Sequence, residues 1–109
     1  ALWSKLERSF TPKHVVRDLP FRGKSETWTF DAAIQTQRRT ALFEIVTPYA
    51  NSVNSAVTKF LDVKGLGNDA PHRVAILTNK DRTPHLPVLA STARWVSVDA
   101  DEETYRKAA

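Results

Sequence analysis

Three consecutive segments, an apolar strand, an amphipathic helix and a second apolar strand, most constrain the fold. Residues 40–47 are dominated by Ala, Leu, Phe, Ile and Val, which is typical of a buried strand. Residues 53–64 repeat apolar side chains at the spacing of one helical stripe, and residues 74–77 are wholly apolar. A helix between two buried strands predicts a crossover that places the strands side by side and parallel. The chain is therefore expected to form an α/β domain.

The segments on either side of this unit add further predicted elements. Leu2, Trp3, Leu6 and Phe10 share one helical face, and Pro12 is expected to end that helix. An extended segment begins at Val15, and we expect Pro20 and Gly23 to interrupt it. Residues 26–34 are rich in Thr, Trp and Phe and predict a strand. Residues 84–93 predict a short helix, and residues 95–98 predict a last strand.

The ends of the central helix are also predicted. Asn51 or Ser52 is the predicted N-cap, and Gly65 is the predicted left-handed residue after the end of the helix.

Composition limits the classes of protein to consider. The 109 residues suffice for one domain, and the absence of cysteine excludes disulfides, thiolate zinc sites and a cysteine nucleophile. No apolar run approaches about 18 residues and no signal pattern opens the chain, so we expect a cytoplasmic protein without a membrane partner. The chain begins at Ala1 and lacks methionine, which favours a piece of a longer protein.

Charge is unevenly distributed along the chain. The net charge is +4, whereas residues 99–109 carry four acidic and two basic side chains. We expect a domain at residues 1–98 followed by an acidic C-terminal segment at 99–109 with helical potential. The basic surplus of the domain favours a polyanionic partner.

Two acidic residues on the predicted hairpin form the main candidate site. If the hairpin turns between Gln37 and Arg38, Asp31 lies directly opposite Glu44 on the same face of the sheet. The other side chains around these two acids on that face would be apolar. Two carboxylates in such a setting need a cation or a shared proton. A divalent metal ion such as Mg²⁺ would satisfy both acids. A register shifted by one or two residues would instead leave the two acids apart and solvated.

At these residues the sequence resembles the PD-(D/E)XK nuclease superfamily. The matching elements are Phe30-Asp31 and the strand at residues 42–46, within an order of helix, three strands, helix and strand. The stretch from Phe21 to Asp31 also resembles an uncharacterised bacterial and phage domain family of that superfamily, often found as a C-terminal half. The resemblance covers roughly residues 1–98. It implies a restriction-endonuclease-like αβββαβ core, in which a mixed central sheet is flanked by helices.

The resemblance also implies the roles of individual residues. Asp31 and Glu44 would hold one or two divalent ions, Mg²⁺ or Mn²⁺, that activate water for attack on a phosphodiester. The superfamily places a lysine two residues after the Glu, but here that position is Val46. Some members carry this lysine on the following helix, so Lys59 or Lys64 would replace it, and each could equally be an ordinary surface lysine. Glu7 is the candidate for an additional acid on the first helix.

Three basic residues are candidates for nucleic-acid contact. Arg38 and Arg39 lie at the predicted hairpin tip, and arginine is the usual contact to phosphate and guanine. Lys24 lies in the turn Gly23-Lys24-Ser25, which is not a P-loop because position 18 is Asp18 rather than glycine. A solvated charged turn would have the same sequence.

These observations lead to one expected function and two alternatives. We expect metal-dependent hydrolysis of nucleic-acid phosphodiesters, with DNA as the substrate. The first alternative is a catalytically degenerate nuclease-fold module that binds DNA or a protein in a bacterial, phage or defence protein. The second is an accessory domain that serves only oligomerisation. As protein partners we expect a second copy in a homodimer or a preceding domain of the full-length chain.

Overall fold

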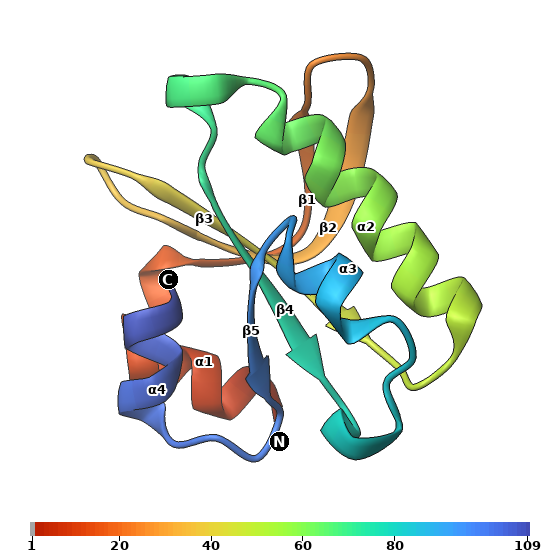
Figure 1. Cartoon of the computed structure of the whole chain (residues 1–109). Helices are drawn as coiled ribbons and strands as arrows, with labels where there is room; N and C mark the ends of the chain where they lie inside the picture. The colour runs from red at the N-terminus through yellow and green to blue at the C-terminus, as the bar shows by residue number, and fades with distance from the viewer. Residues whose placement is uncertain (1) are drawn as a thin grey trace.

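A five-stranded mixed sheet lies at the centre of the computed structural model, which describes residues 2–109 (Figure 1). The strands lie in chain order across the sheet, and neighbours are antiparallel up to the third strand and parallel after it. The strands are β1 (Val15–Arg22), β2 (Thr27–Gln35), β3 (Thr40–Val46), β4 (His72–Leu77) and β5 (Arg94–Ser97). The α-helices are α1 (Leu2–Phe10), α2 (Ala50–Lys64), α3 (Leu86–Ala90) and α4 (Glu102–Ala108). The predicted α/β class and αβββαβ order are confirmed.

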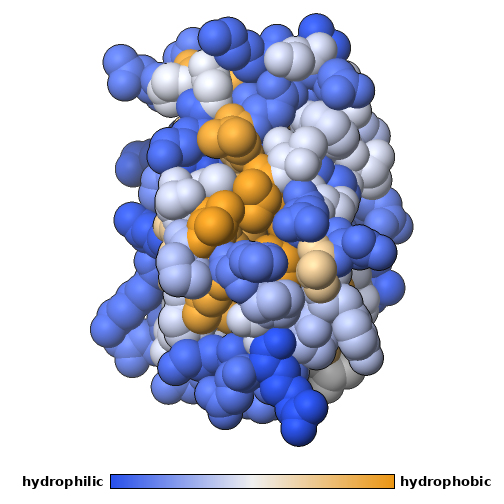
Figure 2. Space-filling view, turned by 45° about the vertical axis from the view of Figure 1, so that its right-hand side comes forward, coloured by the Kyte–Doolittle hydropathy of each residue, from blue (hydrophilic) through white to orange (hydrophobic). Residues whose placement is uncertain are grey.

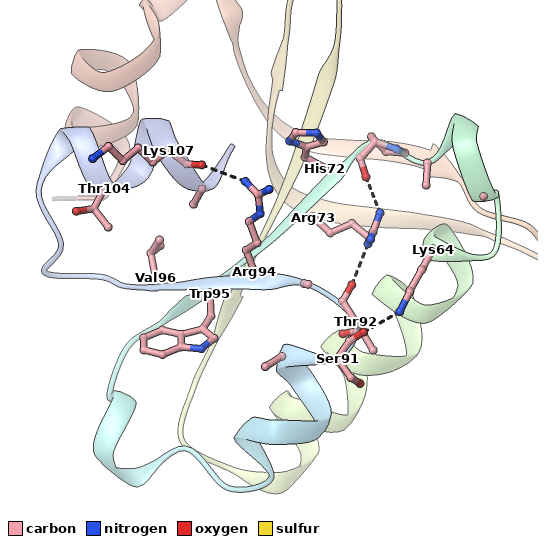
Figure 3. A pocket seen from close by; sticks show the side chains of 16 residues that line it. Lys64, His72, Arg73, Ser91, Thr92, Arg94, Trp95, Val96, Thr104 and Lys107 are labelled. Atoms are coloured by element: carbon pink, nitrogen blue, oxygen red, sulfur yellow. Dashed lines mark hydrogen bonds between the residues drawn. The ribbon is translucent and has the colours of Figure 1, made fainter.

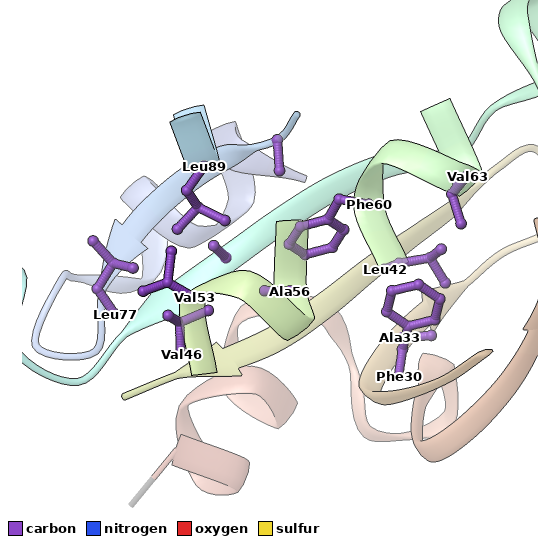
Figure 4. Packing of buried hydrophobic residues seen from close by; sticks show 12 residues of the cluster. Phe30, Ala33, Leu42, Val46, Val53, Ala56, Phe60, Val63, Leu77 and Leu89 are labelled. Carbon is purple, nitrogen blue, oxygen red and sulfur yellow. The ribbon is translucent and has the colours of Figure 1, made fainter. Parts of the chain in front are cut away.

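Helices cover both faces of the sheet. On one face, α2 and α3 contribute Val53, Phe60 and Leu89 to a core that also contains Leu42 and Val46 of β3 (Figure 4). On the other face, a second core includes Leu6, Phe43, Val74, Ile76 and Tyr105, from α1, β3, β4 and α4. The acidic C-terminal segment is therefore helical, and Tyr105 anchors it on the same sheet as α1.

The predicted crossover from β3 through α2 to β4 is confirmed. The two strands are parallel neighbours, in a register that runs from Ala41↔His72 to Val46↔Leu77. The five residues of α3 lie on the second connection, from β4 to β5, which are also parallel. The helix stripe predicted from apolar spacing is the stripe that packs on the sheet, since Val53, Ala56, Phe60 and Val63 are fully buried.

Some local expectations were wrong. Strand β1 continues through Pro20, because β1 pairs only with β2 and an edge strand tolerates a residue without an N–H donor. The N-cap of α2 is Tyr49 rather than Asn51 or Ser52, and the Ser52 hydroxyl instead accepts the Thr47 N–H. Gly65 has an ordinary right-handed conformation.

The left-handed glycine near the end of α2 is Gly67, with φ of 67°. It opens the short 3-10 turn Gly67–Asp69 that leads into β4. Glycine populates positive φ without the steric cost that a Cβ would add. The left-handed residue after α2 is thus Gly67, two positions later than the Gly65 that the sequence pattern predicted.

The outer side of α2 and α3 carries exposed aliphatic side chains. Leu61 and Val88 are 56% and 52% exposed. Figure 2 shows this side of the molecule, with a narrow apolar strip bordered by hydrophilic residues. No helix among residues 2–109 is long and apolar enough to cross a membrane.

Candidate active site

The candidate site lies where strands β2 and β3 separate. Their backbone ladder runs from Gln35↔Thr40 to Ala32↔Phe43 and ends one residue before Asp31 and Glu44. The register predicted from the hairpin is confirmed, and the ladder stops at the pair before the two acids. Strand β1 is also distorted here, because Asp18, with φ of 49°, separates the pairs Arg17↔Ala32 and Leu19↔Phe30.

The two carboxylates replace backbone pairing at this fork. The Asp31 N–H donates to Glu44 Oε1 at 3.1 Å, and the Ile45 N–H donates to Asp31 Oδ2 at 2.8 Å. Each acid therefore holds the backbone of the opposite strand. These bonds keep the strands associated while the carboxylates occupy the space between them.

The separation of β2 from β3 also changes which residues face α2. Strict alternation predicts that Trp28 and Phe30 lie on the face opposite Asp31. Instead Phe30 stacks on Phe60 of α2, with ring centroids 5.9 Å apart, and lies in the same core as Ala33. The strand turns between these residues, so both point toward α2.

Lys59 of α2 completes the site. Its Nζ lies 2.6 Å from Glu44 Oε2 and also donates to the Thr29 carbonyl at 3.0 Å. Both side chains of this ion pair are mostly buried, with 20% of Lys59 and 9% of Glu44 exposed. Asp31, Glu44 and Lys59 are called the carboxylate–lysine cluster below.

Burial dominates the electrostatics of Glu44. It raises the pKa of Glu44 above its usual value, because water no longer solvates the carboxylate. The hydrogen bond from Lys59 acts in the opposite direction, and the negative charge of Asp31 adds to the upward shift of the pKa. Lys59 is therefore the main group that favours the ionised form of Glu44, and the hydrogen bond from the Asp31 N–H acts in the same direction.

Of the two lysines proposed for the missing position, the structure brings one to the acids. Lys64 Nζ donates to the Ser91 carbonyl at 2.9 Å, on the side of α2 that faces α3. Lys59 and Lys64 are five positions apart, which is about 140° around a helix, so the two side chains leave α2 in different directions. Val46, at the usual lysine position, is fully buried in the core beneath α2.

The remaining candidates lie away from the cluster. Glu7 is exposed on α1, which packs on the opposite face of the sheet. Arg38 and Arg39 are exposed in the β2–β3 turn, where the Thr36 N–H donates to the Arg39 carbonyl. Lys24 is exposed in the β1–β2 turn, with its backbone N–H bonded to the Asp62 carbonyl at the end of α2.

Asp62 is a structural anchor that sequence reasoning missed. Its carboxylate accepts hydrogen bonds from the Ser25 and Glu26 N–H groups and from Trp28 Nε1, at 2.8–3.2 Å. The bond from Trp28 is the main cause that lowers the pKa of Asp62. A Cβ at Gly23 would lie 2.5 Å from Asp62 Oδ2, so the glycine permits this contact. The glycine in the turn was the only sequence signal for this contact with Asp62.

The donor set of the cluster fits a hard divalent cation. Within residues 2–109, no group of three or more His, Cys, Asp or Glu side chains gathers as a metal site. Two carboxylates are sufficient for Mg²⁺, which usually keeps several waters and takes further oxygens from phosphate. Asp31 Oδ1 accepts no hydrogen bond from the described residues, and each bonded carboxylate oxygen retains acceptor capacity.

Comparisons with known proteins add little. No protein-family model matches the chain, and no curated protein matches its sequence. Among solved structures, the crystal structure of the protein of unknown function AF1548 is similar, with 9% sequence identity and a TM-score of 0.46. The similarity covers 97% of this chain and 53% of AF1548, so the chain spans about half the length of that protein.

Proposed function

We propose that this domain is a metal-dependent nuclease that hydrolyses phosphodiesters of DNA. The supporting observation is the convergence of Asp31, Glu44 and Lys59 from β2, β3 and α2 at the fork of the sheet. Two acids can hold a metal ion that activates water, and a nearby lysine can stabilise the charge that develops on a phosphate. The resemblance to the PD-(D/E)XK superfamily points to the same three residue types.

Asp31 and Glu44 would hold Mg²⁺ or Mn²⁺ through their carboxylate oxygens. The bound ion would supply an activated water and neutralise charge that develops on the phosphate. The bonds to the Asp31 and Ile45 N–H groups fix the carboxylates against the strand backbones, so their oxygens are oriented before any ligand arrives. Metal binding would also relieve the repulsion between the two acids.

Lys59 would supply positive charge to the reacting phosphate. Its Nζ is held by Glu44 and by the Thr29 carbonyl, which leaves the third ammonium hydrogen for a water or a phosphate oxygen. The ammonium would orient the attacking water and stabilise the negative charge of the transition state. It would thus take the role that Val46 cannot perform.

The test combines metal binding with DNA cleavage. Mg²⁺ is titrated into ¹⁵N-labelled protein, and saturable shifts are expected at the Asp31 and Ile45 amides and should be lost in Asp31→Asn and Glu44→Gln. Glu7→Gln is the matched control, because Glu7 is exposed on the opposite face of the sheet. Lys59→Met should retain metal binding but lose about 100-fold in cleavage rate, whereas Lys13→Met, at an exposed lysine in the 3-10 turn after α1, should leave the cleavage rate unchanged. Undiminished cleavage by Asp31→Asn would refute the proposal.

A second function, DNA binding without cleavage, is favoured by one observation. Lys59 already pairs with Glu44 at 2.6 Å and so supplies part of the positive charge that a metal ion would bring. In that case no Mg²⁺ binding would be seen at millimolar concentration, even with DNA present. DNA would still bind, and charge-removing substitutions at Lys24, Arg38 and Arg39 would weaken that binding.

A further inference from the structure

A basic pocket lies beside the C-terminal end of α2, where strands β4 and β5 begin (Figure 3). Its volume is about 1020 Å³, and it lies among residues from α2, α3, β4, β5 and α4. Four basic side chains line it, Lys64, Arg73, Arg94 and Lys107, together with His72. No aspartate or glutamate is among the lining residues. The pocket thus concentrates positive charge without an acid inside it.

Backbone carbonyls hold these basic groups in place. Arg73 donates from Nε to the Thr92 carbonyl at 2.9 Å and from Nη1 to the Pro71 carbonyl at 2.7 Å. Arg94 Nη1 donates to the Lys107 carbonyl at 3.1 Å (Figure 3). A guanidinium group has five N–H donors, so both arginines keep donors for a ligand.

Three of the four basic side chains at this pocket lack a carboxylate partner among the described residues. Among residues 2–109, no carboxylate lies within 4.0 Å of the charged nitrogens of Lys64, Arg73 or Arg94, whereas Lys107 pairs with Glu103 at 3.5 Å. Arg73 is also partly buried, and burial lowers its pKa because the charged form loses hydration. Neutral carbonyls orient these cations but supply no negative charge. An anion in the pocket would.

We propose that this pocket is a binding site for anions with clustered phosphates, such as a nucleoside polyphosphate or the phosphorylated end of a nucleic-acid strand. Guanidinium groups bind phosphate through paired, charge-assisted hydrogen bonds. The pocket volume is at the upper end of the range of roughly 300–1,000 Å³ that is usual for small-molecule sites. Because Lys59 and Lys64 leave α2 on different sides, this site is separate from the carboxylate–lysine cluster and does not depend on the proposed nuclease activity.

A smaller hollow continues the basic surface toward the β2–β3 turn. It has a volume of about 320 Å³, is lined by Arg38 and Arg39, and shares Ala70, Pro71 and His72 with the larger pocket. Asp69 is its one acidic lining residue. A strand whose terminal phosphate occupies the larger pocket could therefore extend toward the hairpin tip, while a free nucleotide would need only the larger pocket.

The test measures binding without a divalent metal ion, so that it is independent of cleavage. The probes are sodium tripolyphosphate, dATP, and one short DNA strand prepared with and without a 5′-phosphate, each titrated by calorimetry and ¹⁵N NMR. We expect saturable binding, with amide shifts at Thr92 and Arg94 but not at Asp31. Arg94→Gln and Lys64→Gln should each weaken binding about tenfold, as expected for loss of one charge-assisted contact. Arg82→Gln, an exposed substitution with the same change of charge, should not.

The probes separate the two sources of phosphate. Tighter binding of the 5′-phosphorylated strand than of the unphosphorylated strand, with a further loss in Arg38→Gln, would assign the site to a strand end. Tighter binding of tripolyphosphate and dATP would assign it to a free nucleotide.

Three results would overturn the proposal: no saturation up to about 10 mM of any probe, an equal loss in Arg82→Gln, or equally tight binding of a polyglutamate peptide. Glu44→Gln should bind all probes as the unmodified protein does. A failure of the nuclease proposal would therefore be distinguishable from a failure of this one.

Discussion

Replacement of Lys59 by methionine tests the electrostatic account of the candidate site. Methionine preserves most of the side-chain length and packing but removes the ammonium that lies 2.6 Å from Glu44 Oε2. Glu44 would then be a carboxylate with 9% of its side chain exposed, beside a second acid and without a cation. The perturbation therefore acts mainly on the ionised form of Glu44.

The expected loss of stability follows from the burial of this ion pair. Loss of one partner of a fully buried pair costs about 3–5 kcal/mol, whereas exposed pairs contribute about 0–1 kcal/mol. The Lys59–Glu44 pair lies between these limits, since 20% of the lysine side chain remains exposed. We expect Lys59→Met to lower the free energy of unfolding by about 2 kcal/mol near neutral pH.

The pH dependence distinguishes this mechanism from a loss of packing. Burial raises the folded-state pKa of Glu44 above 4.5, so its contribution to stability is complete at low pH and is lost as pH rises through the folded-state pKa. Removal of Lys59 raises that pKa further, so the loss of stability continues over a wider pH range. The difference between the unmodified protein and Lys59→Met should therefore be small at about pH 4 and largest above about pH 7.

Urea denaturation at both pH values measures this difference. Lys64→Met is the matched control and should change stability by less than about 0.5 kcal/mol, since Lys64 is exposed and its one described hydrogen bond goes to a backbone carbonyl. In a Glu44→Gln background, Lys59→Met should have a smaller effect, because no buried carboxylate is left unpaired. An equal loss of stability at the two pH values would refute the reasoning.

Further predictions concern the supporting structure. Gly23→Ala should destabilise the fold by about 1–3 kcal/mol in urea denaturation, because the new Cβ would lie 2.5 Å from Asp62 Oδ2 and 3.3 Å from the backbone of that residue. Gly67→Ala has free space but a φ of 67°, so it should cost about 1–2 kcal/mol through the backbone alone. The pKa of Asp62 is lowered, so its stabilising effect should be lost as pH falls through the folded-state value, which lies below 3.8; Asp62→Asn should remove this part of the acid dependence. Burial raises the pKa of Tyr105 to about 12, so stability should fall as pH rises above 10, and Tyr105→Phe should abolish this part of the loss, as measured by urea denaturation across that range.

The sequence by itself determined the main elements and the hairpin register that brings the two acids together. The polar residues around Gln37 and Arg38 set the turn of the hairpin, and the register that follows brings Asp31 and Glu44 to the same level of the two strands. The helical stripe of α2 and its flanking apolar strands likewise predicted the parallel crossover. These features depend on residues close together in the chain, where spacing alone determines which side chains meet.

Only the tertiary structure decided which lysine reaches the acids and which basic residues gather in a pocket. Lys59 and Lys64 lie on the same helix, and the sequence alone did not choose between them. The direction in which α2 crosses the sheet places only Lys59 beside Glu44. The basic pocket joins basic residues from Lys64 to Lys107, which the packing of α2, β4, β5 and α4 brings together. No local periodicity relates such distant residues, because their approach depends on how whole elements bury their apolar faces against each other.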